Sequence, residues 1–316
     1  MSYKYLDEFT NYGEIVEYSF DEANENIYIA LNSDERLYYN EKLSRLLSFR
    51  ATGQSTTVKL VAVGSPDAVS LEYSIDKSTW IPYTVGTPIQ LANPGEYVSF
   101  RGTNYSFCKD GYNYYSFVIE NGAATAFGDV TSLINGVGGD CDLPNYCFVK
   151  LFNECALLSA APALPSTTAS QYCYYSMFAG CIGLQQAPKL PATTVNRYCY
   201  WEMFRGCSGI KDTPVLPAMT LANACYMDMF RDCTNLERAT LLPAPVLANL
   251  SYYYMFYGCT KLKYIRCLAT NVSASNCLGY WTYSISPIGT FVKSADISNW
   301  PRGDNGIPYN WTIIDE

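Results

Sequence analysis

The sequence predicts a mixed β and α/β protein, in which a small β-sandwich-like module is followed by a solenoid of 26-residue repeats and a C-terminal cap. Three observations predict this class. Residue types recur every 26 positions within residues 146–285, short apolar runs separated by turn residues fill residues 46–107, and the repeat fades before residues 286–316. A period of this length is typical of stacked supersecondary units that cover each other's apolar faces.

The 26-residue period appears in several columns at once. One column is phenylalanine, the next is cysteine, a third holds cysteine or serine, and a fourth holds leucine or methionine. These columns are Phe152, Phe178, Phe204, Phe230 and Phe256; Cys155, Cys181, Cys207, Cys233 and Cys259; Cys147, Cys173, Cys199, Cys225 and Ser251; and Leu151, Met177, Met203, Met229 and Met255. Because the columns repeat together, they predict five stacked coils.

Each repeat predicts a short helix followed by an extended segment. The apolar residues of Cys173–Cys181 fall at i, i+1, i+4, i+5 and i+8, which places them on one face of a helix. Gly180 lies where such a helix would end. The following Leu184–Leu190 precedes Pro191 and is expected to be extended, because a residue before proline is disfavoured in the helical region. Stacked copies would form a narrow parallel ladder.

The repeated core M-F-x-G-C-x-x-L, followed by L-P-A-T, resembles the BspA-like leucine-rich repeats of surface proteins from gut and oral bacteria and their bacteriophages. The resemblance covers residues 146–285 and implies a right-handed leucine-rich-repeat solenoid that binds or displays, without a catalytic residue. Tyr73–Trp80 and Phe100–Asn104 resemble the β module that often precedes these repeats. Gly289–Lys293 and Gly306–Thr312 resemble the segment that closes them.

The chain before the repeats divides into three parts. Residues 1–45 are acidic and tyrosine-rich, and we expect this segment to anchor or oligomerise the protein, because it is too small to fold alone. Within it, Ile27–Leu31 favours a strand and Asp34–Leu47 a short amphipathic helix. Residues 46–107 form the β-sandwich-like module, and residues 108–145 the connection and N-terminal cap of the solenoid. The candidate strands are Leu46–Ala51, Thr57–Val63, Val69–Ile75, Ile89–Leu91, Tyr97–Arg101 and Tyr114–Glu120.

The composition argues against several functions. The net charge of -8 disfavours nucleic acid as a partner, because proteins that bind phosphates concentrate positive charge. No run approaches the ~20 apolar residues of a membrane span, so membrane insertion is not expected. The chain has no histidine, which removes histidine-based triads and imidazole metal ligands. We therefore expect no enzymatic activity, no cofactor and no metal.

Two local patterns carry weaker alternatives. Asp140 and Asp142 flank Cys141, and such carboxylates serve in glycosidases or as calcium ligands, although solvated turn residues are the commoner reading. Asp296 and Asp304 offer a second such pair. Arg302, Gly303 and Asp304 spell a tripeptide known from adhesion and read better as a turn.

The thirteen cysteines are expected to be packing residues. Two cysteines eight apart on a helix would lie roughly 12 Å from each other along its axis, beyond disulfide reach. Cysteine packs well as a small apolar residue, so the columns favour a buried ladder of thiols. Some bridging between coils remains the alternative.

Positions two beyond the first cysteine of each repeat point away from the apolar face of the predicted helix. They hold Tyr175, Trp201, Met227 and Tyr253. Rigid aromatic side chains in a row give contact area at little entropic cost, so we expect them to form a ligand-binding stripe. The alternative is that they shield the helix layer or make an oligomer contact.

These observations favour a non-enzymatic bacteriophage virion surface protein, a head or tail fibre or decoration, that adheres to host-surface glycan or protein. The N-terminal Met1–Phe20 does not have the form of a secretory signal, which suggests a virion protein made in the bacterial host cytoplasm. The alternative is an exported bacterial cell-surface adhesin of the same repeat family. Other expected partners are virion proteins, through residues 1–45, and further copies of the chain in a trimer or dimer.

Overall fold

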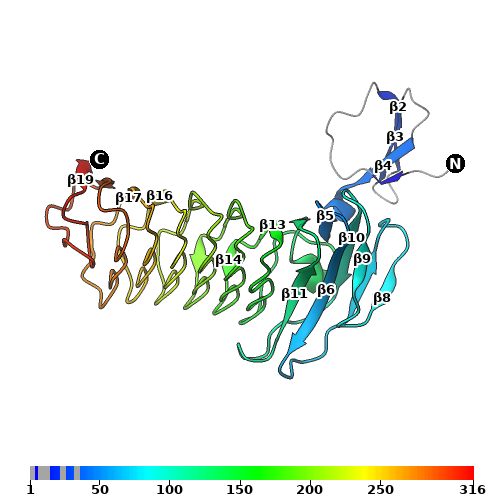
Figure 1. The fold of residues 1–316 in the computed structure, drawn as a ribbon, viewed down its shortest axis with the longest axis horizontal. Coiled ribbons are helices and arrows are strands. Elements are labelled where there is room, and N and C mark those ends of the chain that lie inside the picture. Colours follow the sequence, from blue (N-terminus) through cyan, green and yellow to red (C-terminus); the bar gives the residue numbers. More distant parts are fainter. Residues whose placement is uncertain (1–3, 6–14, 22–25, 32–35) are drawn as a thin grey trace.

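The computed structural model describes residues 4–5, 15–21, 26–31 and 36–316. The protein is mostly β, and a β-solenoid of about six turns occupies residues 168–315 (Figure 1). It extends as a long stack of coils from a module of longer strands. Within the described residues the helices are short, α1 (Glu41–Ser44) and α2 (Ser132–Asn135) having four residues each.

The N-terminal strands form a sheet of their own. Its order is β1-β4-β3-β2, and its strands are β1 (Lys4–Tyr5), β2 (Ile15–Asp21), β3 (Asn26–Leu31) and β4 (Arg36–Asn40). The strand predicted at Ile27–Leu31 is confirmed. The helix predicted over Asp34–Leu47 is wrong except at α1, because Arg36–Asn40 pairs with β3 as a strand. Asp34 and much of the proposed anchoring segment lie outside the described residues.

Two facing sheets form the module. One has the order β13-β12-β5-β10-β7-β8 and the other β11-β6-β9. Their strands are β5 (Leu47–Ala51), β6 (Thr56–Val63), β7 (Leu71–Ser74), β8 (Ile81–Tyr83), β9 (Ile89–Leu91), β10 (Tyr97–Gly102), β11 (Tyr114–Glu120), β12 (Ala124–Phe127) and β13 (Leu158–Ala160). The Phe117 ring meets Phe49 and Phe100 of the opposite sheet at 4.9 and 5.2 Å. The six predicted strands are confirmed, whereas β8 and β12 were not predicted.

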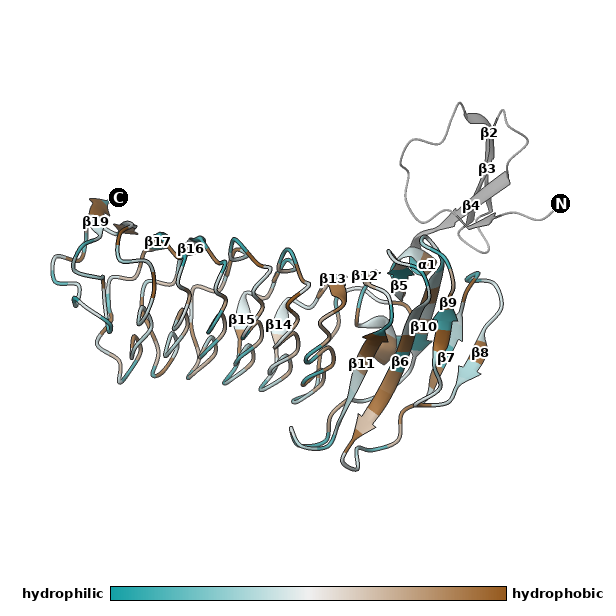
Figure 2. Cartoon of the chain, viewed as in Figure 1, coloured by the Kyte–Doolittle hydropathy of each residue, from teal (hydrophilic) through white to brown (hydrophobic). Residues whose placement is uncertain are grey.

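The module continues directly into the solenoid. Strands β11 and β12 fall in the predicted connection, yet each completes a sheet by pairing antiparallel with β6 and β5. Strand β12 also pairs parallel with β13 of the first repeat, so the sheet runs on into the coils. The expected cap on the first coil is therefore built from a strand of the module. Figure 2 shows hydrophobic stretches on β6 and β11, in accord with the buried residues of both strands.

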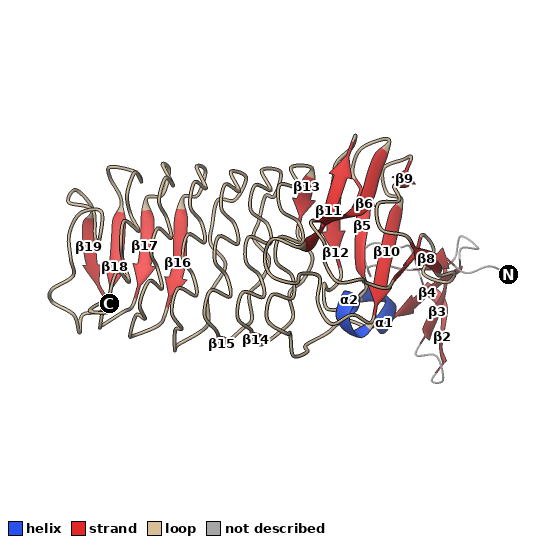
Figure 3. Ribbon diagram, turned by 90° about the horizontal axis from the view of Figure 1, so that it is seen from below, coloured by secondary structure: helices blue, strands red, loops and turns tan. Residues whose placement is uncertain are grey.

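The solenoid carries two narrow parallel ladders. One joins β14 (Thr168–Ala169) to β15 (Thr194–Val195). The other has the order β16-β17-β18-β19 and is seen as parallel arrows in Figure 3. Its strands are β16 (Arg238–Leu242), β17 (Tyr264–Cys267), β18 (Thr290–Lys293) and β19 (Thr312–Asp315). The predicted parallel ladder is thus confirmed at β16 and β17, whereas Leu184–Leu190 does not form a strand.

The helices predicted in the repeats are wrong. Cys173–Cys181 forms consecutive turns, in which backbone N–H groups alternate between two kinds of acceptor. The N–H of Tyr175 donates to the carbonyl of Tyr172, three residues earlier, while the N–H of Ser176 donates 2.8 Å to the carbonyl of Trp201 in the next coil. Half of the donors in this segment therefore hold neighbouring coils together.

A left-handed residue at every fourth position explains why a helix does not form. Tyr172, Ser176 and Gly180 have φ of 56°, 50° and 76°, and a right-handed helix cannot continue through such residues. The same conformation recurs in the neighbouring coil at Tyr198 and Glu202, which are not glycines. The apolar period of this segment is therefore four residues, close enough to 3.6 to imitate a helix.

Stacked rings run through the core of the solenoid. Successive ring centroids of the phenylalanine column lie 5.2, 5.6, 5.4 and 6.0 Å apart, from Phe152 to Phe256. The column joins the module at Phe117, 5.7 Å from Phe152, and ends on Trp281, 6.0 Å from Phe256. A parallel stack of buried tyrosines runs from Tyr174 to Tyr252. These rings fuse the module and the solenoid into one hydrophobic core.

The cysteine columns lie in the same core, as predicted. All thirteen cysteines belong to the described part of the chain and are free thiols. The cysteines that end the consecutive turns of a coil donate 3.0 Å hydrogen bonds to backbone carbonyls of the preceding coil; they are Cys181, Cys207, Cys233 and Cys259. Each thiol thus fills a small apolar space and satisfies a carbonyl.

Candidate functional site

The outer face of the consecutive turns carries the predicted ligand-binding residues. We call it the turn face, and it consists of the columns headed by Tyr146, Val149, Lys150 and Asn153 and their equivalents at 26-residue intervals. The predicted residues Tyr175, Trp201, Met227 and Tyr253 lie on it, in one column, and each is half-buried. They point outward because the turns place the two residues before each of them in the core.

Trp201 lies at the centre of a first aromatic cluster. Its ring stacks on Tyr175 with centroids 4.4 Å apart and an interplanar angle of 15°. The adjacent column contributes Tyr146, Tyr172 and Tyr198, whose rings stack at successive distances of 4.8 Å. Tyr198 lies 5.5 Å from Trp201, so the two columns form one surface. The second column was not predicted, although its recurrence at 26 residues was a usable signal.

Charged residues interrupt the aromatic surface in the middle of the turn face. Glu202 pairs with Arg205 at 3.0 Å, and Asp228 pairs with Arg231 at 3.1 Å. Burial raises the pKa of Asp228 and the hydrogen bond from Arg231 opposes that rise. Met227 lies in this belt, in the column between Trp201 and Tyr253. The rings of the predicted stripe therefore form two groups, with the charged belt between them.

A second aromatic cluster lies beyond the belt. The rings of Tyr253 and Tyr254 meet at 4.2 Å, Tyr254 and Tyr280 stack at 5.6 Å, and Tyr257 and Tyr283 stack at 5.0 Å. The hydrogen bond that the Tyr253 hydroxyl donates to Tyr254, together with burial, raises the pKa of Tyr253 to about 12. The Tyr253 hydroxyl therefore stays protonated and acts as a neutral hydrogen-bonding group at physiological pH.

A small hollow adjoins the second cluster, at the end of the turn stack. We call it the end hollow. It encloses about 240 Å³ and is lined by Tyr253, Val272, Ala274, Asn276, Cys277, Leu278, Gly279, Tyr280, Pro301 and Asn305. None of these lining residues is charged. At Gly279 a Cβ would lie 2.5 Å from the Tyr253 ring, so the glycine lets that ring lie directly against the backbone.

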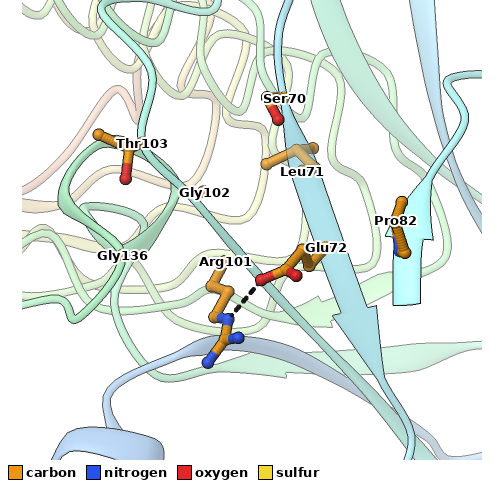
Figure 4. Close-up of a pocket in the computed structure, with 8 residues that line it drawn as sticks. All are labelled: Ser70, Leu71, Glu72, Pro82, Arg101, Gly102, Thr103 and Gly136. Atoms are coloured by element: carbon orange, nitrogen blue, oxygen red, sulfur yellow. Dashed lines mark hydrogen bonds and ion pairs between the residues drawn. The ribbon is translucent and has the colours of Figure 1, made fainter. Parts of the chain in front are cut away.

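A larger hollow of about 500 Å³ lies on the module, beside β7 and β10 (Figure 4). Its charged residues are Glu72 and Arg101, which pair at 2.9 Å. The Arg101 guanidinium also lies 4.0 Å from the centre of the Trp80 ring. Both charges are thus engaged with each other or with protein, and the hollow presents no uncompensated charge to a ligand.

Two residues of the weaker sequence candidates make hydrogen bonds that tie parts of the chain together. The Asp140 carboxylate accepts hydrogen bonds from the backbone and hydroxyl of Thr167, both at 2.9 Å, and so ties the cap to the second coil. Arg302 donates 2.7 Å to the carbonyl of Tyr309 within a terminal turn. No group of three or more metal-ligating side chains gathers within the residues that the structure describes.

The buried thiols are poorly suited to nucleophilic chemistry. Burial raises the pKa of Cys181 and Cys207 well above the ordinary value, and that of Cys225 to about 12. Because the thiolate is the reactive form, these groups are inert in the folded chain.

No helix in the described part of the chain has the length and apolarity to cross a membrane. Comparisons with protein-family models, curated proteins and solved structures give no match to this chain.

Proposed function

We propose that this chain is a non-enzymatic binding and display protein, whose turn face adheres to glycan or protein on a host surface. The first aromatic cluster carries the proposal. Its rings stand on a backbone that is hydrogen-bonded from coil to coil, so a partner meets a rigid aromatic surface with little ordering cost. Half-buried tryptophan and tyrosine are the residue types that dominate binding energy at protein interfaces.

The biological setting is proposed from the sequence resemblance. The M-F-x-G-C-x-x-L repeats favour a BspA-like leucine-rich-repeat protein, and we place it on the surface of a bacteriophage virion as a head or tail fibre or decoration. Residues 1–45 would then hold it to other virion proteins and support a homo-oligomer. An exported bacterial cell-surface adhesin is the second candidate, because the same repeats occur in both.

Binding through the first cluster is tested by removing its two stacked rings. The double variant Tyr175→Ala/Trp201→Ala is compared with the intact chain for binding to a glycan array and to intact gut bacterial cells. We expect a loss of at least roughly tenfold in affinity, about 1.4 kcal/mol. Val215→Ala, at an exposed residue outside the cluster, is the control. Binding that survives the double variant would remove this surface from the function.

Location and assembly need separate measurements. Gold-labelled antibody against this chain, imaged by electron microscopy, separates a virion protein from a cell-envelope adhesin. Light scattering on the full chain and on a chain lacking residues 1–45 tests the anchoring segment. We expect the full chain to be oligomeric and the shortened chain to be monomeric; an unchanged mass would contradict the role given to residues 1–45.

A further inference from the structure

Within the described residues, the stack of consecutive turns ends at its C-terminal coil in two backbone N–H groups that have no acceptor. In the fifth coil, the N–H groups of Leu250 and Tyr252 donate 3.1 and 2.9 Å to carbonyls of the sixth. Their equivalents one coil later are Asn276 and Leu278. Within the described residues, neither of these N–H groups donates to an acceptor. A row of peptide donors is therefore left open at the C-terminal end.

The other positions of this end are closed by the chain itself. The N–H of Tyr280 donates 2.6 Å to the side-chain oxygen of Asn305, and that of Thr282 donates 3.3 Å to the carbonyl of Asp304. The terminal segment thus replaces a seventh coil for part of the row. It stops short of Asn276 and Leu278, and the end hollow lies where it stops.

A second copy stacked head to tail does not fit the open donors. Their complement would be the carbonyls of a first coil, and the module already occupies that end. Phe107 and Phe117 donate 2.8 and 2.7 Å to the carbonyls of Cys147 and Leu151. The open donors are therefore available to a small ligand that carries its own carbonyl.

The residues that line the end hollow indicate the chemistry of the rest of that ligand. Tyr253 and Tyr280 supply aromatic surface, and Asn276 and Asn305 supply side-chain amides, which donate and accept hydrogen bonds. Uncharged walls disfavour an ion, which would lose its hydration without gaining a counter-charge. A volume of about 240 Å³ is below the roughly 300–1,000 Å³ of sites for drug-sized ligands, so the hollow suits one ring.

We propose that the end hollow binds a neutral N-acetylhexosamine residue, such as a terminal N-acetylglucosamine of a surface glycan. Its acetamido carbonyl accepts from the N–H of Leu278, in the place of the Cys277 carbonyl that accepts from Tyr252 one coil earlier, and a ring hydroxyl beside it accepts from the N–H of Asn276. The methyl group packs on the apolar wall and the sugar ring lies against Tyr253. This inference rests on the proposed adhesive function, because it names the class of glycan that the turn face recognises.

The test follows the two backbone amides directly. Methyl N-acetyl-β-glucosaminide is titrated into the ¹⁵N-labelled full chain, with methyl β-glucoside and methyl β-glucuronide as comparison ligands. We expect the amide resonances of Asn276 and Leu278 to shift with the N-acetylated sugar alone, because only that ligand brings an amide carbonyl. Equal shifts with the glucoside, shifts with the glucuronide alone, or no shifts with any of the three would overturn the proposal.

Two variants localise the effect. In Gly279→Ala, the added Cβ displaces the Tyr253 ring from the backbone, and we expect at least roughly tenfold weaker binding. Ile288→Ala, at an exposed residue outside both the turn face and the end hollow, is expected to bind normally. Normal binding by Gly279→Ala would also overturn the proposal. Cell binding that is lost in Tyr175→Ala/Trp201→Ala, with no shift of these two amides on addition of the N-acetylated sugar, would refute only this inference. Cell binding that survives the double variant would refute the proposed function.

Discussion

The inner and outer faces of the consecutive turns share one backbone, but the side chains of the inner face repeat from coil to coil whereas those of the outer face vary. On the inner face, the column of Phe178 and Phe204 keeps the same ring in five successive coils, because each ring stacks on identical neighbours. On the outer face, the column of Trp201 changes from coil to coil and ends in Gly279. The architecture is thus encoded on the inner face, and the outer face is free to encode recognition.

Removing one inner ring tests this comparison most severely. Phe204→Ala interrupts the stack at its centre and leaves a cavity, so we expect the free energy of unfolding to fall by roughly 3–5 kcal/mol. Trp201→Ala, three residues away on the outer face, is expected to cost about 0.5–1.5 kcal/mol, mainly from its lost stacking on Tyr175. Urea denaturation followed by circular dichroism measures both. Similar losses for the two variants would contradict the division between the faces.

The left-handed positions give the next largest effect. Gly206 has φ of 72°, and a Cβ there would meet nothing closer than 3.9 Å. Gly206→Ala should therefore cost only the conformational penalty of a left-handed alanine, roughly 1–2 kcal/mol. Ser208→Ala is the control in the same coil. An unchanged denaturation midpoint for Gly206→Ala would show that the coil relaxes out of this conformation.

Alkaline pH should weaken the inner face selectively. The pKa of Cys225 is about 12 in the folded chain and 9.0 ordinarily, so the unfolded state loses its proton first as pH rises. Stability from this thiol is complete below pH 9 and declines above it. Between pH 8 and 10 the decline is about 1.4 kcal/mol for the one group. Unfolding of Cys225→Ala should show that much less pH dependence; the same slope in both proteins would contradict the assignment.

The surface ion pairs should have the smallest effect. Lys263 and Glu237 pair at 2.6 Å on adjacent coils, and both side chains are exposed. Glu237→Gln is expected to lower the denaturation midpoint slightly at low ionic strength and not at about 1 M salt, where charges are screened within roughly 3 Å. Thermal scans at both salt concentrations measure the difference. A salt-independent loss would indicate a packing role for Glu237.

The period and the module strands could be predicted because they rest on side-chain patterns. The conformation of the coils could not, because Tyr172 and Ser176 adopt positive φ without being glycine, and a four-residue apolar period resembles a helical one. Gly180 was read as a helix end, although it marks one of a series of left-handed residues.

The candidate site divides in the same way. The outward positions of Tyr175, Trp201 and Tyr253 followed from the repeat, because any backbone that buries the two preceding residues turns these outward. The separation into two clusters depends on which residues neighbour them in other columns. The end hollow could not be predicted, because it arises where the chain stops supplying carbonyls to Asn276 and Leu278.

The hydrogen bonds from the module to the first coil give assembly a direction. Each coil's alternate N–H groups need the next coil's carbonyls, and the first carbonyls are met by Phe107 and Phe117 of the module. Since stability in such arrays comes from nearest neighbours, the module supplies the first coil with a neighbour on which it can stack. Synthesis from the N-terminus therefore delivers the module before the coils that stack on it.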